Sequence, residues 1–332
     1  MAVIAPPREQ EPRVPPPGLG QGTRPPGVVT DRLFKWVALV SGLLVLVILG
    51  LIAVTMTKEA WPWFSAEGLN IFSTTWDPAK GEFGAGAMIY GTFLVGIIAL
   101  VIAVPVSIGI ALFVTEIAPR PLRKPIVYTV DLLAAIPSVV YGLWALAVLT
   151  QPLADLYSNI SSATEGIPIL DTLFAEPSPT GLSFMTAGII VAIMIVPIIT
   201  SITREVYATT PSSLKEAAYG LGATRWEMIR GSVFPHSRGG VVSAVMIGLG
   251  RAIGETIAVA LLIGSSQRVS AHILGPGDSL ASIIANQFNE ATGEQRAALI
   301  GMGVVLFVLT VVVGVLARSV VARFDRRTGA TL

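Results

Sequence analysis

The stretch Ser212–Pro235 reads SSLKEAAYGLGATRWEMIRGSVFP and is the longest polar segment between two hydrophobic spans of this chain. Ser213 is followed three residues later by Glu216, the spacing of a capping box, which predicts a short helix beginning there. Gly220 and Gly222 are expected to break that helix, because glycine is a poor helix former. The stretch therefore starts as a helix that ends in a glycine corner.

A second short helix is predicted directly after the corner. Thr224 and Glu227 repeat the capping-box spacing, and Pro235 is expected to end the helix from beyond its C-terminus. A loop that merely connects two spans needs no helix caps. A segment that binds a partner protein does need them, because the partner recognises one fixed conformation of the corner. Residues 212–235 are therefore predicted to form a docking element at the mouth of a membrane.

The composition indicates an integral membrane protein. Of 332 residues, 53% are hydrophobic and 13% are charged, and the mean hydropathy is +0.73, which is too apolar for a soluble domain. The net charge of +1 points to no nucleic-acid partner and no acidic substrate. The chain has no cysteine and two histidines, which argues against disulfides, iron–sulfur clusters and a histidine-rich metal site.

Six stretches are long and apolar enough to cross the hydrocarbon core of a bilayer, which is about 30 Å thick. They are Leu33–Met56, Met88–Thr115, Val127–Thr150, Phe184–Arg204, Gly240–Ile263 and Ala297–Arg318. The fold class that follows is an all-α polytopic membrane protein with six transmembrane helices.

The charges of the connecting loops alternate in sign and set the predicted orientation. The loops after the first and third spans are acidic. Basic residues gather after the second span, in the docking element and after the last span: Arg120, Arg123, Lys124, Lys215, Arg225, Arg230, Arg238, Arg323, Arg326 and Arg327. By the positive-inside rule, both termini and the docking element face the cytoplasm of a cell whose plasma membrane holds the chain.

Four parts are expected along the chain. Residues 1–30 hold eight prolines and are expected to be a disordered cytoplasmic tail, because this composition cannot bury a core. Residues 31–83 contain the first span and an extracytoplasmic loop. Residues 84–318 hold the other five spans and the docking element, and residues 319–332 form a basic cytoplasmic tail.

The fifth span carries two charges in the segment GLGRAIGET. Arg251 and Glu255 lie four residues apart, so they can pair on one face of a helix, and Gly250 and Gly254 allow close helix approach. An arginine at mid-span costs roughly 2.5–3.5 kcal/mol on insertion scales, so a reason for keeping it is expected. Three interpretations stay open: an ion pair that locks the helix bundle, an anion site on a transport path, and a contact to a partner subunit.

The third span contains Pro137 within the segment AAIPSVVYG. One interpretation is a kink whose freed carbonyl groups Ser138 helps to satisfy. The other is a broken helix in a pathway wall, where Ser138 and Tyr141 offer polar groups to a solute.

Several catalytic motifs are absent from the sequence. It contains no GxxxxGK[ST] loop, so the chain is not expected to bind ATP itself, and no HExxH or GxSxG motif. The glycines of GLGRAIG have GxGxxxG spacing and lie inside a span, so a dinucleotide site is rejected. The chain is therefore expected to be no enzyme and to hold no cofactor.

The segment EAAYGLG, from Glu216 to Gly222, resembles the EAAxxxG motif of the membrane subunits of ABC importers, and Pro235 matches the closing proline of that motif. Ser232 and Phe234 depart from the Ile and Leu of the family pattern. The resemblance covers about residues 84–318 and implies a type I ABC importer permease fold with a cytoplasmic coupling helix. The ATPase-coupling residues that it implies are Glu216, Ala217, Ala218, Gly222 and Arg225.

Two further segments, IPSVVYG and GRAIGET, resemble the PstC-type permeases of phosphate-specific (Pst) ABC importers. This resemblance implies a PstA-type partner permease, two PstB-type ATPase subunits that bind ATP and Mg²⁺, and a PstS-type phosphate-binding protein outside. The substrate-path residues that it implies are Arg251, Glu255, Thr256, Ser138 and Tyr141. Arg251 is expected to offset desolvation of the anion, while Glu255 either accepts the proton of hydrogen phosphate or moderates the hold of Arg251.

Two other functions remain as alternatives. The chain could be the permease of an ABC importer for another small solute, against which the IPSVVYG and RAIGET segments argue. It could also be a secondary anion transporter, but such transporters usually show inverted repeats, which this sequence does not.

Overall fold

The structure is a computed structural model that describes residues 28–328, and almost every element in that range is a helix. Contacts divide the chain into two units, one ending at Ala53 and the other beginning at Val54. Helix α1 (Val28–Glu67) runs through the boundary, and its side chains from Arg32 to Ile52 are exposed and mostly apolar. The expected tail of residues 1–30 lies outside the described residues, except that α1 already includes residues 28–30.

Four of the predicted spans are confirmed as helical stretches long and apolar enough to cross a membrane. They run over Arg32–Phe72, Gly86–Ile117, Phe184–Ala208 and Gly293–Ser319, in the part of the chain that the structure describes. The corresponding elements are α1 with the 3-10 helix η1 (Gly68–Phe72), α2 (Gly86–Leu112) with the π-helical η2 (Phe113–Ile117), α7 (Phe184–Ala208) and α13 (Gly293–Thr328).

The predicted third span is not one straight helix. It consists of α3 (Arg120–Ala135) and α4 (Ser138–Val148), which meet at an angle of 91°. The break follows from Pro137, which has no N–H for a helical hydrogen bond and forces the preceding Ile136 into an extended conformation.

The predicted fifth span is also interrupted. Helix α10 (Phe234–Ile253) ends before Gly254, and α11 (Ile257–Leu262) begins after Thr256. The expectation of a continuous helix through Glu255 was wrong, because glycine and a β-branched threonine flank a carboxylate that the fold buries. With four spans, or five if the bent pair counts, the total of six stays a prediction.

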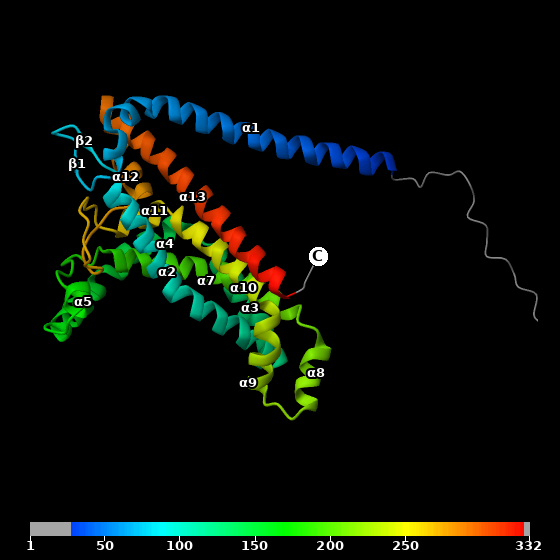
Figure 1. The fold of residues 1–332 in the computed structure, drawn as a ribbon. Coiled ribbons are helices and arrows are strands. Elements are labelled where there is room, and N and C mark those ends of the chain that lie inside the picture. Colours follow the sequence, from blue (N-terminus) through cyan, green and yellow to red (C-terminus); the bar gives the residue numbers. More distant parts are fainter. Residues whose placement is uncertain (1–27, 329–332) are drawn as a thin grey trace, which may run out of the picture. The chain divides into compact units, whose positions relative to one another are not determined.

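The core of the second unit is built from α2, α7 and α10 (Figure 1). Small residues let these helices approach closely. A Cβ atom at Gly188 of α7 would lie 2.4 Å from Cγ2 of Ile98 on α2, and one at Gly248 of α10 would lie 2.7 Å from Cδ1 of Ile199 on α7. Large aliphatic side chains fill the spaces between these contacts, so the three helices form one packed bundle.

The shorter elements lie mostly at the two ends of this bundle. At one end are α8 (Ser212–Gly220), α9 (Arg225–Met228) and the π-helical η3 (Ile229–Val233). At the other end a hairpin pairs β1 (Trp76–Asp77) with β2 (Glu82–Phe83) in antiparallel register, near α12 (Leu280–Gln287) (Figure 1). The remaining helices are α5 (Thr150–Thr164) and α6 (Leu170–Phe174).

Candidate functional site

The docking element is a pair of short helices joined at a corner, as predicted. Helix α8 ends at Gly220, and Gly222 has a φ of +83°, a conformation that favours glycine. The first predicted capping box is wrong, because the N-cap position of α8 is Pro211 and no side chain caps it. The fixed φ of that proline prepares the chain for the helix, so the hydroxyl of Ser213 is not needed as a cap.

The second capping box is confirmed. The backbone N–H of Thr224 donates to Oε2 of Glu227 at 2.8 Å, and the N–H of Glu227 donates to the hydroxyl of Thr224 at 3.4 Å. The hydrogen bonds that Thr224 donates to this carboxylate, from its backbone N–H and from its hydroxyl, hold the pKa of Glu227 below its usual value, so the cap stays charged at neutral pH. The corner therefore has one defined shape without any partner present.

Pro235 does not end the second helix, contrary to the prediction. Helix α9 continues through η3 into α10, and Pro235 lies in the first turn of α10. The proline has no N–H to donate, and the preceding η3 segment, with its wider π-helical turn, lets the helix continue past it. The widened π turn joins the docking element to α10 through unbroken helical backbone.

Apolar side chains are exposed at the corner. Leu221 is 90% exposed between the two glycines, and Tyr219 and Trp226 are also exposed on either side of it. Exposed apolar residues gathered at one place mark an interaction surface. Leu221 was not predicted as a functional residue from the sequence. Its place between two glycines at the corner was the available signal, because a leucine there has no core in which to be buried.

An ion pair fastens α8 to the end of α2. Lys215 Nζ lies 2.6 Å from Oε1 of Glu116, which belongs to η2, and the Glu116 side chain is only 9% exposed. Ala218 also packs against a buried cluster in which Leu112, Tyr207 and Met228 take part. Two features of the sequence point to this contact, a lone carboxylate at the end of an apolar span and a lysine inside the docking element, but nothing in the sequence indicates that they meet.

The ion pair between Arg251 and Glu255, which was one of the three interpretations of the fifth span, is not formed among the described residues. Arg251 is exposed in the last turn of α10, and among the described residues it has no ion-pair partner within 4 Å. Glu255 is 9% exposed and lies beyond the end of α10, so the helical spacing that would have brought the two side chains together does not apply. Ile247, which lies four residues before Arg251 on the same side of α10, is also exposed, so the face that carries Arg251 is open in this chain.

The segment IPSVVYG packs against α11, the helix that directly follows GRAIGET. A Cβ atom at Gly142 on α4 would lie 3.1 Å from Cα of Ala258 on α11, the helix that follows Glu255. The Tyr141 hydroxyl donates to the carbonyl of Leu133 at 2.9 Å and thereby ties α4 to α3 across the bend.

The two remaining predicted path residues lie at these helix breaks. Ser138 begins α4 and is half-buried, and no hydrogen bond joins its side chain to the freed carbonyl groups of α3 in the described residues. Tyr141, rather than Ser138, therefore satisfies a carbonyl group that the kink at Pro137 frees. The Thr256 hydroxyl donates to the carbonyl of Gly254 at 3.3 Å within the second break.

A multi-helix bundle with broken spans and a rigid docking corner at one end is the architecture of transporter membrane subunits. The chain belongs to the family of binding-protein-dependent transport system inner membrane components, whose profile matches residues 103–329, and it is a multi-pass membrane protein. It is 45% identical over 305 residues to the phosphate transport system permease protein PstC of Mesorhizobium japonicum, which covers 91% of this chain and 93% of that protein. The PstC protein of Haemophilus influenzae is 42% identical over 301 residues, covering 90% of this chain and 95% of the relative.

Solved structures agree on the fold. A chain of a bacterial alginate ABC transporter aligns with a TM-score of 0.59 at 18% identity, over 92% of this chain and 99% of its own length. A chain of the MetNI methionine ABC transporter aligns with a TM-score of 0.52 at 18% identity, over 75% of this chain and 99% of its own length. The ABC importer permease fold expected from EAAYGLG is thereby confirmed, as is the resemblance to PstC-type permeases.

Proposed function

We propose that this chain is the membrane-spanning permease subunit of an ATP-driven importer of inorganic phosphate. The observation that carries the proposal is the identity of more than 40% to proteins named PstC over about nine-tenths of both chains. The complete importer would add a PstA-type permease, two PstB-type ATPase subunits that hold ATP and Mg²⁺, and a PstS-type phosphate-binding protein. This subunit itself would carry no catalytic group.

The docking element is the proposed contact to the ATPase, on the cytoplasmic side with both chain termini. The exposed side chains of Tyr219, Leu221 and Trp226 would enter a groove of that subunit. Glu216, Ala217 and Arg225, which are exposed on the same two helices, would lie at the edge of this contact.

Movement of the docking element would reach the bundle by two routes. One is the continuous backbone from α9 through η3 into α10, which carries Arg251 in its last turn. The other is the pair of Lys215 and Glu116, which pulls on the end of α2. Because α2 and α10 both pack on α7, the two routes act on one bundle and would change its opening as a unit.

Phosphate would pass along the open face of α10. Arg251 presents a guanidinium whose parallel donors match two oxygens of an oxyanion. Glu255, Thr256, Ser138 and Tyr141 lie at or beside the two helix breaks, where backbone groups are free of helical bonds. The PstA-type subunit would close the other side of this path, because an exposed arginine in a membrane span needs cover.

A strain that lacks its own phosphate importer tests the function. Introducing this chain with its partner subunits should restore uptake of phosphate, and mild-detergent purification should recover an ATPase and a second permease with it. Restored uptake of a different solute without phosphate would favour an ABC importer of another class. Phosphate uptake that persists after loss of the ATPase subunit would favour a secondary transporter instead.

A further inference from the structure

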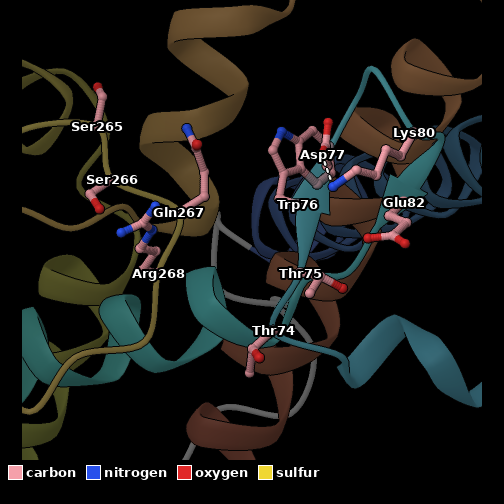
Figure 2. Close-up of a pocket in the computed structure, with 10 residues that line it drawn as sticks. All are labelled: Thr74, Thr75, Trp76, Asp77, Lys80, Glu82, Ser265, Ser266, Gln267 and Arg268. Carbon is pink, nitrogen blue, oxygen red and sulfur yellow. Dashed lines mark ion pairs between the residues drawn. The ribbon is translucent and has the colours of Figure 1, made fainter.

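Two pockets of the second unit have opposite linings. The one between the hairpin and the segment that follows α11 is polar, and Lys80 and Asp77 neutralise each other in it at 2.9 Å (Figure 2). The other has a volume of about 450 Å³, lies between α10 and α13 and is mostly apolar, and we call it the α10–α13 groove. It is lined by Ser243, Met246 and Ile247 of α10 and by Gly314, Ala317, Arg318, Val321 and Ala322 of α13.

The α10–α13 groove follows both helices lengthwise. Its α13 residues recur at spacings of three and four, which places them on one face of that helix, and the first and last of them are about 12 Å apart along the axis. Gly314 has no side chain, and a Cβ atom there would meet nothing within 4 Å, so the floor of the groove is open. A helix with its side chains is about 10–12 Å wide, so a neighbouring helix would lie over this groove, whereas a single hydrocarbon chain would fit along it.

Arg318 is the one charged side chain among the described residues that line the groove. It lies next to Ser319, where the apolar span ends, so its guanidinium can reach the level of the lipid headgroups. This end of α13 is on the side of the bundle where α8 and α9 lie (Figure 1). Arg318 is exposed, and within residues 28–328 no carboxylate lies within 4 Å of it. The groove thus joins an apolar recess to a cation that lacks a counter-ion in the described part of the chain.

We propose that the α10–α13 groove binds an anionic glycerophospholipid from the membrane leaflet on the side of the docking element. One acyl chain would lie along Met246, Ile247 and Gly314. The phosphodiester group would accept hydrogen bonds from the guanidinium of Arg318, whose parallel donors match two phosphate oxygens. Basic pockets between spanning helices are sites of this kind for anionic lipids. The proposal does not depend on which solute the importer carries.

The apolar lining favours a lipid over a free phosphate ion. Both ligands offer phosphate oxygens to Arg318, but only the lipid has a hydrocarbon chain whose burial in the groove adds to the charge interaction. Ile247 also belongs to the open face of α10 that carries Arg251. A bound lipid would therefore border the proposed phosphate path and would hold α10 against α13.

Fluorescence quenching by brominated lipids tests the site in the assembled importer. Because the chain has no cysteine, Ser319→Cys creates one position for a thiol-reactive fluorophore, exposed beside Arg318 but not lining the groove, and the partner subunits are used in cysteine-free form. The importer is reconstituted in phosphatidylcholine vesicles that contain a small, equal fraction of either brominated phosphatidylglycerol or brominated phosphatidylcholine. Quenching should report about fivefold higher occupancy by the phosphatidylglycerol, the ratio that corresponds to roughly 1 kcal/mol for one arginine.

Two variants and one control sharpen the result. Arg318→Gln in the reporter background should bring the ratio close to one, whereas Arg318→Lys should keep most of it, because a lysine still attracts the phosphate as a point charge. Arg238→Gln is the matched control and should leave the ratio unchanged. Arg238 is likewise exposed, on α10, and has no ion-pair partner within 4 Å in the described chain, but it does not line the groove. Recovery of the partner subunits with each variant shows that it has assembled.

Several outcomes would overturn the lipid site. A preference for phosphatidylglycerol that survives in Arg318→Gln, or that is lost equally in Arg238→Gln, would show attraction by the charge of the whole surface. Equally weak quenching by both brominated lipids would identify the groove as a contact with the partner permease. Loss of the preference on adding inorganic phosphate at equal ionic strength would show a site for the free anion. Because quenching needs no transport, failure of phosphate uptake with the preference intact would overturn only the proposed function.

Discussion

Two pairs of opposite charges behave in opposite ways in this molecule. Lys215 and Glu116 are separated by 99 residues, yet they meet at 2.6 Å at the docking end of the bundle. Arg251 and Glu255 are separated by four residues, yet the break after α10 keeps them from pairing. The first pair joins two elements, whereas the second leaves both groups available for something else.

This difference suggests that the two pairs would serve different purposes in the proposed transporter. In the proposed importer the pair of Lys215 and Glu116 would be a mechanical joint that has to stay closed, which fits charges that are satisfied within the chain. A site on a path has to be free for its ligand, so its charges cannot cancel each other. We therefore expect loss of a charge from Arg251 or Glu255 to weaken phosphate binding. Loss of a charge from Lys215 or Glu116 should instead weaken the coupling of ATP hydrolysis to transport.

The largest effect is expected from Arg251→Gln. Losing the charged donors to an oxyanion removes roughly 1.5–3 kcal/mol, so uptake should fall about 10–100-fold, and Arg251→Lys should retain part of it as a point charge. Phosphate uptake by cells expressing each variant is the measurement. Uptake at the parental level in a fully assembled Arg251→Gln importer would place the arginine away from the path.

A smaller loss is expected from Lys215→Glu, which sets two carboxylates side by side at the joint. Breaking a partly buried pair costs on the order of 1–3 kcal/mol, and the expected result is about tenfold less phosphate imported per ATP hydrolysed. The exchanged variant Lys215→Glu with Glu116→Lys should recover most of the coupling. If the single and the exchanged variants both assemble with their partner subunits but the exchanged variant does not regain coupling, the pair does not transmit movement.

Next in size is Gly222→Val at the corner of the docking element. The φ of +83° is costly for a β-branched residue, roughly 1–2 kcal/mol, so the corner should change shape and coupling should fall about fivefold. Gly220→Ala is the matched control, because a Cβ there meets nothing within 4 Å and its φ is not positive. Equal ATP-driven uptake by the two variants would contradict a role for the corner's shape.

The smallest effect on transport is expected at Asp278, whose substitution should instead change stability. This buried carboxylate accepts hydrogen bonds from the Ser282 hydroxyl and the Ser279 N–H and has no ion-pair partner within 4 Å in residues 28–328. Burial raises its pKa from 3.8 to about 6, so the stability that it contributes is present below pH 4 and is lost as the pH rises through 6. The full difference is roughly 3 kcal/mol by the two pKa values, or about 5 °C in melting temperature.

Asp278→Asn should remove this pH dependence, because the amide oxygen still accepts from the N–H of Ser279 while carrying no charge. Thermal unfolding of the purified complex at pH 5 and pH 7.5 measures it: the advantage of the variant should grow with pH. An advantage that shrinks with rising pH would mean that a cation stabilises the carboxylate.

Much of the fold could be predicted from the sequence, because local rules decide it. Four apolar stretches became spanning helices, and Thr224 with Glu227 formed the predicted cap. A kink or break at Pro137 was predicted, and the 91° bend confirms it. The break at Gly254–Thr256 was missed, since hydropathy averages over a window and ignores single residues. The prediction that Pro235 ends the second short helix was wrong, because a proline can also lie near the start of a helix.

The joint between Lys215 and Glu116 could not be predicted, because it depends on where two elements end in space rather than on any spacing in the chain. The interpretation of Arg251 and Glu255 as an ion pair does not hold in this structure, since a four-residue spacing brings side chains together only while the helix continues. The roles proposed for these residues rest on that geometry.

ATP-driven uptake of phosphate into proteoliposomes tests the central claim most directly. The importer would be reconstituted with its ATPase and binding protein, with ATP at the ATPase side and phosphate at the other. The account predicts accumulation above the outside concentration with ATP, and none with a non-hydrolysable analogue or with an ATPase that cannot hydrolyse ATP. Equal accumulation with and without ATP hydrolysis would contradict the claim that movement of the docking element drives transport through this chain.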